Sequence, residues 1–407
     1  MLAPDYLSKI AEGAEEIASS LHDYLVKQII ERIMARLGRG EPYLLTSADA
    51  WRIKTLQESG YLLEDITAEL AKYTKLQTNE IKSAMQDAGV KALAYDDAIY
   101  RAAGLSPVAL EQSPELIRIM ERNMLATMGE WKNYTATTAN AAQRLYIEQC
   151  DLAYNKVMTG ATSYTQAVKE AITKIAADGV TVTYPTGHKD TIETATARAV
   201  RTGIAQATGD ISIKRMEEME WDIILVSAHV GARTGDGGEN PGNHFWWQGK
   251  YYSRSGNDKR FPPFSVTGYG SGEGLCGWNC RHSFGGGTGR PEDNPYKGIS
   301  SEENRKVEEL EKKQRRYERR IRKTKREVAG LQTSVENCPD EKLKFELQQE
   351  LDRKSALLSK QNKAYNQFCR ENDLKPLRER LQIAEWNREK AMKAAGAARR
   401  YERRNNE

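Results

Sequence analysis

The sequence predicts an α+β protein with a mostly α-helical N-terminal region, a small β-rich or irregular central module and a C-terminal antiparallel helical hairpin. Three observations predict it. Apolar residues recur at helical spacing from residue 5 to about 178. Residues 221–298 are dense in Gly, Pro, Trp, Tyr and His and show almost no helical period. From residue 300 a heptad repeat begins. We therefore expect four successive segments, at 1–110, 111–215, 216–299 and 300–407.

The N-terminal half is expected to contain several separate helices. Ser47 is suited to cap the start of a helix, and Gly60 is suited to follow its end. Further helices are expected at about 62–74, 78–88 and 92–103, and a second helical block at 113–178. A Val/Thr alternation with a Thr-Gly turn predicts a short hairpin near 180–187. A helix follows, with Asp190 as its cap and Glu193 three residues later.

The central module is expected to begin with a buried strand in WDIILVSAHV, which is rich in Ile, Leu and Val. The rest of the module reads as loops and short strands.

The C-terminal segment carries two matched heptad seams, which predict a helical hairpin. The turn ENCPDE separates them, and Pro339 suits the first position of the second helix. A third basic helix is expected at about 376–404. The seam positions are Val307, Leu310, Gln314, Tyr317, Ile321, Thr324, Val328 and Leu331, then Leu347, Leu351, Lys354, Leu358, Gln361, Tyr365 and Phe368.

Charge is distributed unevenly along the chain, whose net charge is +4. Residues 301–407 hold 29 basic and 20 acidic residues, whereas the remainder holds 32 basic and 37 acidic residues. A basic tail on a mildly acidic body predicts a polyanionic partner or an acidic protein surface, the alternative being a long solvated helix. The candidate partner-binding residues are Arg315, Arg316, Arg319, Arg320, Arg322, Lys323, Lys325 and Arg326.

Some classes of protein are disfavoured. The N-terminus has no basic stretch followed by an apolar run, so no secretion signal is expected. No window approaches about 18 uninterrupted apolar residues, so no membrane span is expected. The five cysteines are scattered and odd in number, which favours thiols in a reducing cytoplasm over a disulfide framework.

The stretch GYGSGEGLCGWNCRHSFGGGTG, residues 268–289, raises the question of metal binding. Cysteine and histidine form tetrahedral zinc sites, often with the first two ligands two to four residues apart. The candidate ligands are His229, His244, Cys276, Cys280 and His282. The alternative is that Cys276 belongs to the core and that His282 only forms hydrogen bonds in a loop.

Two catalytic interpretations of the same residues are weaker. Cys280 with His229 or His244, and with Asn279 or Asp236, has the residue types of a cysteine nucleophile and its base. The glycine-rich loops match neither phosphate-binding pattern. A zinc- or cysteine-dependent hydrolase or a toxin-like effector is therefore retained only as an alternative function. Non-specific DNA binding through the basic tail is another.

A longer pattern is more specific than any of these chemistries. It reads S-x-H-x-x-A-R, then H-x-x-W-Q-G, then G-Y-G and G-L-x-G-x-N-C-R-H. With the preceding helix TARAVRTGIAQATGD, it closely resembles the phage minor capsid protein 2 family, which is related to the Mu F-like head morphogenesis proteins of tailed phages. The residues are Ser227, His229, Ala232, Arg233, His244, Trp247, Gln248, Gly249, Gly268, Tyr269, Gly270, Gly274, Leu275, Gly277, Asn279, Cys280, Arg281 and His282.

The resemblance implies a structural protein of a phage head, made in the host cytoplasm and located in the virion, inside the capsid. It implies the portal protein or the major capsid protein as partners, with packaged DNA as a further partner and ejection with the genome as an open alternative. It implies no catalytic activity and no cofactor, apart from the zinc question. We expect the polar motif residues to form a buried network that holds the central loops. These are His229, Arg233, His244, Gln248, Asn279, Cys280, Arg281 and His282.

Overall fold

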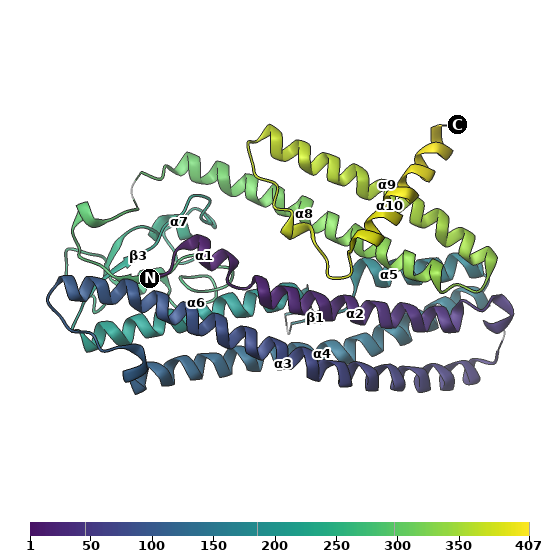
Figure 1. The fold of residues 1–407 in the computed structure, drawn as a ribbon, viewed down its shortest axis with the longest axis horizontal. Coiled ribbons are helices and arrows are strands. Elements are labelled where there is room, and N and C mark those ends of the chain that lie inside the picture. Colours follow the sequence, from purple (N-terminus) through teal and green to yellow (C-terminus); the bar gives the residue numbers. More distant parts are fainter. Residues whose placement is uncertain (45, 185, 297, 407) are drawn as a thin grey trace. The chain divides into compact units, whose positions relative to one another are not determined.

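The computed structural model describes residues 1–44, 46–184, 186–296 and 298–406, and these are mostly helical with a few short strands (Figure 1). The α-helices are α1 Pro4–Lys9, α2 Glu12–Leu37, α3 Ala48–Ala102, α4 Pro114–Met158, α5 Tyr164–Asp178, α6 Ile192–Glu218, α7 His244–Trp247, α8 Ser301–Glu336, α9 Glu341–Glu371 and α10 Arg388–Asn406. The strands are β1 Thr181–Thr183, β2 Lys189–Thr191, β3 Ile223–Val226, β4 Tyr251–Ser253 and β5 Phe284–Gly286. Short 3₁₀ helices lie at Glu41–Leu44, Leu110–Gln112, Phe264–Thr267, Pro291–Asp293 and Glu379–Leu381.

The residues group into two compact units, each built from three separated stretches. The first unit contains Met1–Glu15, Thr74–Asn133 and Thr194–Lys312. The second contains Glu16–Tyr73, Tyr134–Glu193 and Lys313–Glu407. The boundaries fall inside helices α2, α3, α4, α6 and α8, so each of these helices contributes residues to both units. The four successive segments expected from the sequence follow changes of composition and stay a prediction.

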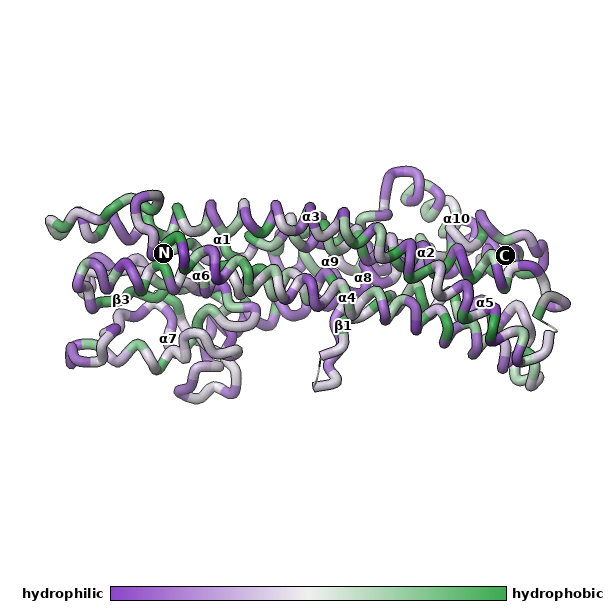
Figure 2. The backbone as a smooth tube through the Cα atoms, turned by 90° about the horizontal axis from the view of Figure 1, so that it is seen from below, coloured by the Kyte–Doolittle hydropathy of each residue, from purple (hydrophilic) through white to green (hydrophobic). Residues whose placement is uncertain are grey.

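Helix α3 replaces the separate helices that the sequence predicts between residues 47 and 103. Its start agrees with the predicted cap, because the Ser47 hydroxyl accepts a hydrogen bond of 3.3 Å from the Ala50 amide. Gly60 does not end the helix. A glycine inside a helix costs only about 1 kcal/mol relative to alanine, and buried apolar side chains such as Trp51 and Leu62 continue on both sides of it. Hydrophobic and hydrophilic residues alternate along this helix in Figure 2.

The predicted hairpin near 180–187 forms from β1 and β2, which pair antiparallel with Thr181 opposite Thr191. Pro185, which the sequence places in this hairpin, lies outside the described residues. Asp190 belongs to β2, and helix α6 begins at Ile192.

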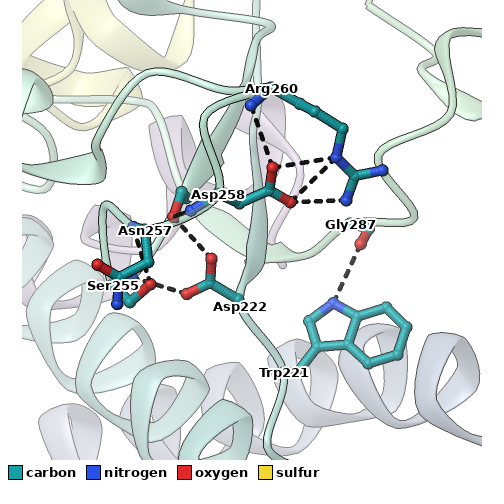
Figure 3. A network of polar contacts seen from close by, with 8 residues as sticks. Trp221, Asp222, Ser255, Asn257, Asp258, Arg260 and Gly287 are labelled. Atoms are coloured by element: carbon teal, nitrogen blue, oxygen red, sulfur yellow. Dashed lines mark hydrogen bonds and ion pairs between the residues drawn. The ribbon is translucent and has the colours of Figure 1, made fainter.

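A three-stranded antiparallel sheet in the first unit positions the central loops. Its strand order is β4-β3-β5, and β3 lies within the predicted buried strand. The carboxylate of Asp222, just before β3, accepts hydrogen bonds from the Ser253 hydroxyl at 2.6 Å and the Ser255 amide at 2.7 Å (Figure 3). The indole of Trp221 donates to the carbonyl of Gly287 at 3.0 Å, just beyond β5. These contacts fasten both outer strands to the start of β3.

Helices α8 and α9 run antiparallel in the second unit. Gln314 donates to the Tyr365 hydroxyl at 3.2 Å, and Glu327 pairs with Lys354 at 2.8 Å, so partner numbers fall along α9 as they rise along α8. The central seam residues Ile321, Val328 and Leu331 are fully buried, as heptad packing requires.

The third helix of the tail starts later than the sequence predicts. Helix α10 begins at Arg388, and residues 372–387 form an irregular connection with a short 3₁₀ helix. Leu381 and Ile383 of this connection are buried. The carbonyl of Leu381 accepts a hydrogen bond of 2.7 Å from the Lys325 ammonium. The prediction of a regular helix from Pro376 is therefore wrong, because this connection forms only a short 3₁₀ helix and is held by its buried side chains and its bond to Lys325 of α8.

Among the described residues, no helix has both the length and the apolarity required to cross a bilayer.

Candidate functional site

Loops that follow β3 and precede β5 bring three histidine rings together in the first unit. The rings of His229 and His282 stack with their centroids 4.5 Å apart. The ring of His244, in the short helix α7, lies 5.4 Å from that of His282. Trp247 is fully buried and packs its indole 4.8 Å from the His282 ring. Residues more than 50 positions apart in the sequence therefore form one aromatic cluster.

Gln248 joins two of these histidines and fixes a proton position. Its side-chain oxygen accepts a hydrogen bond from the backbone amide of His229 at 3.0 Å and lies 2.9 Å from Nε2 of His282. An oxygen that accepts from a backbone amide is a carbonyl oxygen, so Nε2 of His282 carries the proton in this contact. Nδ1 of a neutral His282 then holds a lone pair.

Both cysteines of the glycine-rich stretch are buried next to this histidine. Sγ of Cys280 lies 3.6 Å from Nδ1 of His282. Sγ of Cys276 lies 3.8 Å from the carbonyl oxygen of His282. His244, Cys280 and His282 each offer one atom that could bind a metal, and these three atoms lie within 4.8 Å of one another.

Burial keeps these groups uncharged. Burial, with Arg281 nearby, lowers the pKa of His229 to about 4. Burial, with Arg233 nearby, lowers the pKa of His244 to about 4. Burial, with His229 and His244 nearby, also lowers the pKa of His282 well below its ordinary value. Burial raises the pKa of the Cys280 thiol. At neutral pH the cluster therefore consists of neutral imidazoles and protonated thiols.

The two motif arginines bind neighbouring loops. A terminal nitrogen of Arg233 lies 2.7 Å from Nε2 of His244, and the same nitrogen of the histidine lies 2.8 Å from the carbonyl of Glu273. A carbonyl can only accept, and Arg233 also lies 3.4 Å from the carbonyls of Glu273 and Trp278. The Arg233 guanidinium can only donate, so an unprotonated Nε2 of His244 accepts from Arg233, whereas a protonated Nε2 donates to the Glu273 carbonyl.

Several motif glycines allow one backbone to approach another. A Cβ on Gly277 would lie 2.2 Å from the carbonyl oxygen of Ser271, and one on Gly274 would lie 2.2 Å from that of Gly268. Any larger residue at either position would force the backbone apart. Gly268, Gly270 and Gly249 have positive φ values of 60°, 78° and 67°, where L-residues are strained.

The remaining motif residues lie at the edges of the cluster. The Ser227 hydroxyl accepts a hydrogen bond of 3.0 Å from the Ser283 amide, which links β3 to β5. The Tyr269 hydroxyl donates to Asp210 of α6 at 2.7 Å. Asn279 is exposed and has a φ of 55°, a left-handed conformation that asparagine tolerates. The structure thus places Asn279 in a turn at the surface, apart from the buried histidines.

The beginning of α8 supplies contacts that the motif did not reveal. The buried amide of Asn304 donates to the carbonyl of Ala232 and accepts from its amide, both at 2.8 Å. Arg281 pairs with Glu311 at 3.0 Å, and the Thr234 hydroxyl donates to Glu308 at 2.9 Å. Continuing the alternating steps of the heptad seam back from Val307 reaches the exposed Glu303 and not Asn304, so the seam gave no signal for this contact.

The basic residues of α8 divide into two groups. Arg315, Arg316, Arg319, Arg320 and Lys323 are exposed. By contrast, the Lys325 ammonium is buried, and Arg326 pairs with Asp23 and Glu193 inside the second unit. Arg322 is half-buried and donates to the carbonyl of Arg380 at 2.7 Å. We call Arg315, Arg316, Arg319 and Arg320 the arginine stripe.

The geometry does not suit a cysteine nucleophile. A reactive cysteine is partly accessible and has a lowered pKa, whereas Cys280 is 1% exposed and its pKa is raised. Asn279 is exposed, so it does not lie with the buried Cys280 as a catalytic partner would. The Asp236 carboxylate accepts hydrogen bonds from Gly238 and Asn240 in an exposed turn. Neutral histidines beside a buried thiol are better suited to packing or to binding a metal.

The known proteins that this chain is similar to come from bacteriophages. A family model described as phage minor capsid protein 2 matches residues 2–369. A protein of Lactococcus phage LL-H named "Structural protein" is 24% identical over 297 residues, which cover 68% of this chain and 76% of that protein. No solved structure matches the chain.

The family match and the phage relative together indicate a structural protein of a bacteriophage. Since the family model covers most of the sequence, the chain belongs to the phage minor capsid protein 2 family.

Proposed function

We propose that this protein is an internal component of the phage head, bound to the portal or to the inner face of the capsid, and that it acts structurally and not as an enzyme. The match to the minor capsid family over residues 2–369 is the observation that carries the proposal. The buried, uncharged state of the His and Cys cluster supports it, because catalysis would require an accessible and ionisable group there.

The location is tested on purified particles. Intact particles and particles opened to release DNA are treated with a protease, and the protein is followed by mass spectrometry. We expect it in every particle preparation, protected in intact particles and cleaved in opened ones. Particles that lack the protein, or cleavage in intact particles at the rate seen in opened ones, would refute the internal location.

A second role is supported by the arginine stripe. Arg319 and Arg320 lie one helical turn after Arg315 and Arg316, and all four are exposed, so they present positive charge on one side of α8. Arginine binds phosphate through its planar, bidentate guanidinium. We propose that this stripe contacts the packaged DNA while the rest of the protein holds its place in the head.

DNA binding is tested by measuring the salt dependence of affinity. Replacing Arg316, Arg319 and Arg320 with glutamine should lower affinity for DNA of any sequence and reduce the slope of log K against log salt by about 3. A matched variant replaces the exposed Lys342, Lys360 and Lys363 of α9 with glutamine, with the same loss of charge. Equal effects of both variants would show that net charge, and not the stripe, is responsible.

A further inference from the structure

We propose that His244, Cys280 and His282 form a zinc site that fastens the loops of the central module. The proposal does not depend on where the protein lies in the particle. It concerns how residues 227–298, which contain little regular structure, keep one conformation.

The spacing of the ligand atoms is that of a tetrahedral metal site. Zinc lies about 2.3 Å from a cysteine sulfur and about 2.0–2.1 Å from a histidine nitrogen, which places sulfur and nitrogen roughly 3.6 Å apart in a tetrahedron. Sγ of Cys280 and Nδ1 of His282 are 3.6 Å apart. The ligand atoms of all three residues lie within 4.8 Å of one another, so His244 would have to move closer by about 1 Å to complete a tetrahedron.

The proton positions also suit a metal. The side-chain oxygen of Gln248 accepts a hydrogen bond from Nε2–H of His282, so the lone pair on Nδ1 faces the Cys280 sulfur. A histidine ligand characteristically donates its other ring proton to an oxygen in this way, which orients the ring. Gln248 is itself held by the His229 amide at 3.0 Å. His282 is therefore positioned as a ligand by residues that do not touch the metal.

The ligand set favours zinc over harder cations. One thiol and two imidazoles suit zinc, whereas magnesium and calcium prefer oxygen ligands. On binding, the Cys280 thiol releases its proton to solvent and its sulfur ligates as thiolate, which adds negative charge beside Arg233 and the metal. Three protein ligands leave the fourth position of the tetrahedron to a water molecule, as in catalytic zinc sites, but we assign the site a structural role because its three ligands are buried.

The site would join two separate parts of the module. His244 comes from the short helix α7, and Cys280 and His282 come from the segment that leads into β5. Cys276 and His229, also considered as ligands from the sequence, lie next to the site: Cys276 contacts the carbonyl of His282, and the His229 ring stacks on His282. Without a metal, the same geometry is a weak hydrogen bond from the Cys280 thiol to His282, which is the competing explanation.

The experiment measures metal content and metal environment in the full-length protein. The protein is purified, loaded with zinc, freed of loose metal, and assayed by elemental analysis. We expect about one zinc per chain in the wild type and in Cys276→Ser, and at least a tenfold loss of zinc in Cys280→Ser. No retained zinc in the wild type, or equal zinc in Cys280→Ser and Cys276→Ser, would overturn the proposal.

Cobalt provides a test that requires no variant. Replacing zinc with Co²⁺ in the wild type should give the strong visible bands of a tetrahedral site and a thiolate charge-transfer band. Bands typical of six oxygen ligands, or no thiolate band, would overturn the proposal even if Cys280→Ser fails to fold. Gln248→Leu, which keeps all three ligands, should lower zinc affinity by about 10- to 100-fold.

Discussion

Arg326 is the residue whose replacement should most clearly separate a structural charge from a partner-binding charge. It lies on the same helix as the arginine stripe, but its guanidinium pairs with Asp23 at 3.4 Å and with Glu193, and all three side chains are nearly inaccessible to water. Replacing Arg326 with methionine keeps most of the volume and leaves two buried carboxylates without their cation.

The size of the effect follows from the pKa of Glu193. Burial alone would raise this pKa, but Arg326, with smaller contributions from His22 and hydrogen bonds, lowers it to about 2. The difference from the ordinary glutamate value near 4.3 corresponds to about 3 kcal/mol of stabilisation at neutral pH. Removing one partner of a buried ion pair typically costs about 3–5 kcal/mol. We therefore expect Arg326→Met to lose about 3 kcal/mol in the free energy of unfolding.

The assay is urea denaturation followed by circular dichroism, with Arg319→Met as the control. Arg319 is exposed on the same helix, so its replacement should change stability by less than about 0.5 kcal/mol. A loss for Arg326→Met within about 1 kcal/mol of the control would refute the reasoning.

The pH dependence gives the sign of the same interaction. A carboxyl group whose pKa is lower in the folded state stabilises above the unfolded pKa, and this contribution disappears as pH falls through the folded value. In wild type the contribution from Glu193 is thus present above about pH 4 and is lost toward about pH 2. In Arg326→Met, burial raises the pKa of Glu193. The difference in free energy of unfolding between wild type and Arg326→Met should therefore become smaller as pH falls from 7 toward 4. A deficit that stays constant over that range would contradict the charge explanation.

Two further predictions concern the central module. Gly277→Ala should destabilise the protein by about 1–3 kcal/mol, because the new Cβ meets two backbone carbonyls. The control Gly129→Ala, in the middle of α4 with no atom near its new Cβ, should be neutral or stabilising. Thermal unfolding compares the two variants, and equal melting temperatures would contradict the close approach at Gly277. Asn304→Ala should cost about 2–4 kcal/mol by leaving the backbone groups of Ala232 without partners, and the exposed neighbour Glu303→Ala should cost almost nothing. Amide hydrogen exchange at Ala232 should accelerate in Asn304→Ala, and unchanged protection would show that the side chain is dispensable.

Periodic features were largely predictable from the sequence. The heptad seam of the tail predicted the buried residues in the middle of α8 and α9, such as Ile321, Val328, Leu347 and Leu358, because a repeat of 3.5 residues keeps one face of a helix apolar. The Val/Thr alternation predicted β1 and β2, and the Ile/Leu/Val run predicted β3. Helix ends were less predictable. Gly60 and Pro376 have the local properties of boundaries, but burial of the flanking residues continued α3, and α10 begins only after a connection whose Leu381 is buried and bonded to Lys325 of α8.

The sequence by itself determined the family and the residues that make up the glycine-, tryptophan- and histidine-rich motif, since those depend on residue types at fixed spacings. Only the tertiary structure decided which of them meet. It brought His244 to Cys280 and His282, left Asn279 at the surface, and paired Ala232 with Asn304. It also showed that, of the basic residues of α8, the arginine stripe is exposed whereas Arg326 is buried in an ion pair. The reason is physical: burial and long-range contacts set the charge state and the partner of a side chain, and neither is encoded in the neighbouring residues alone.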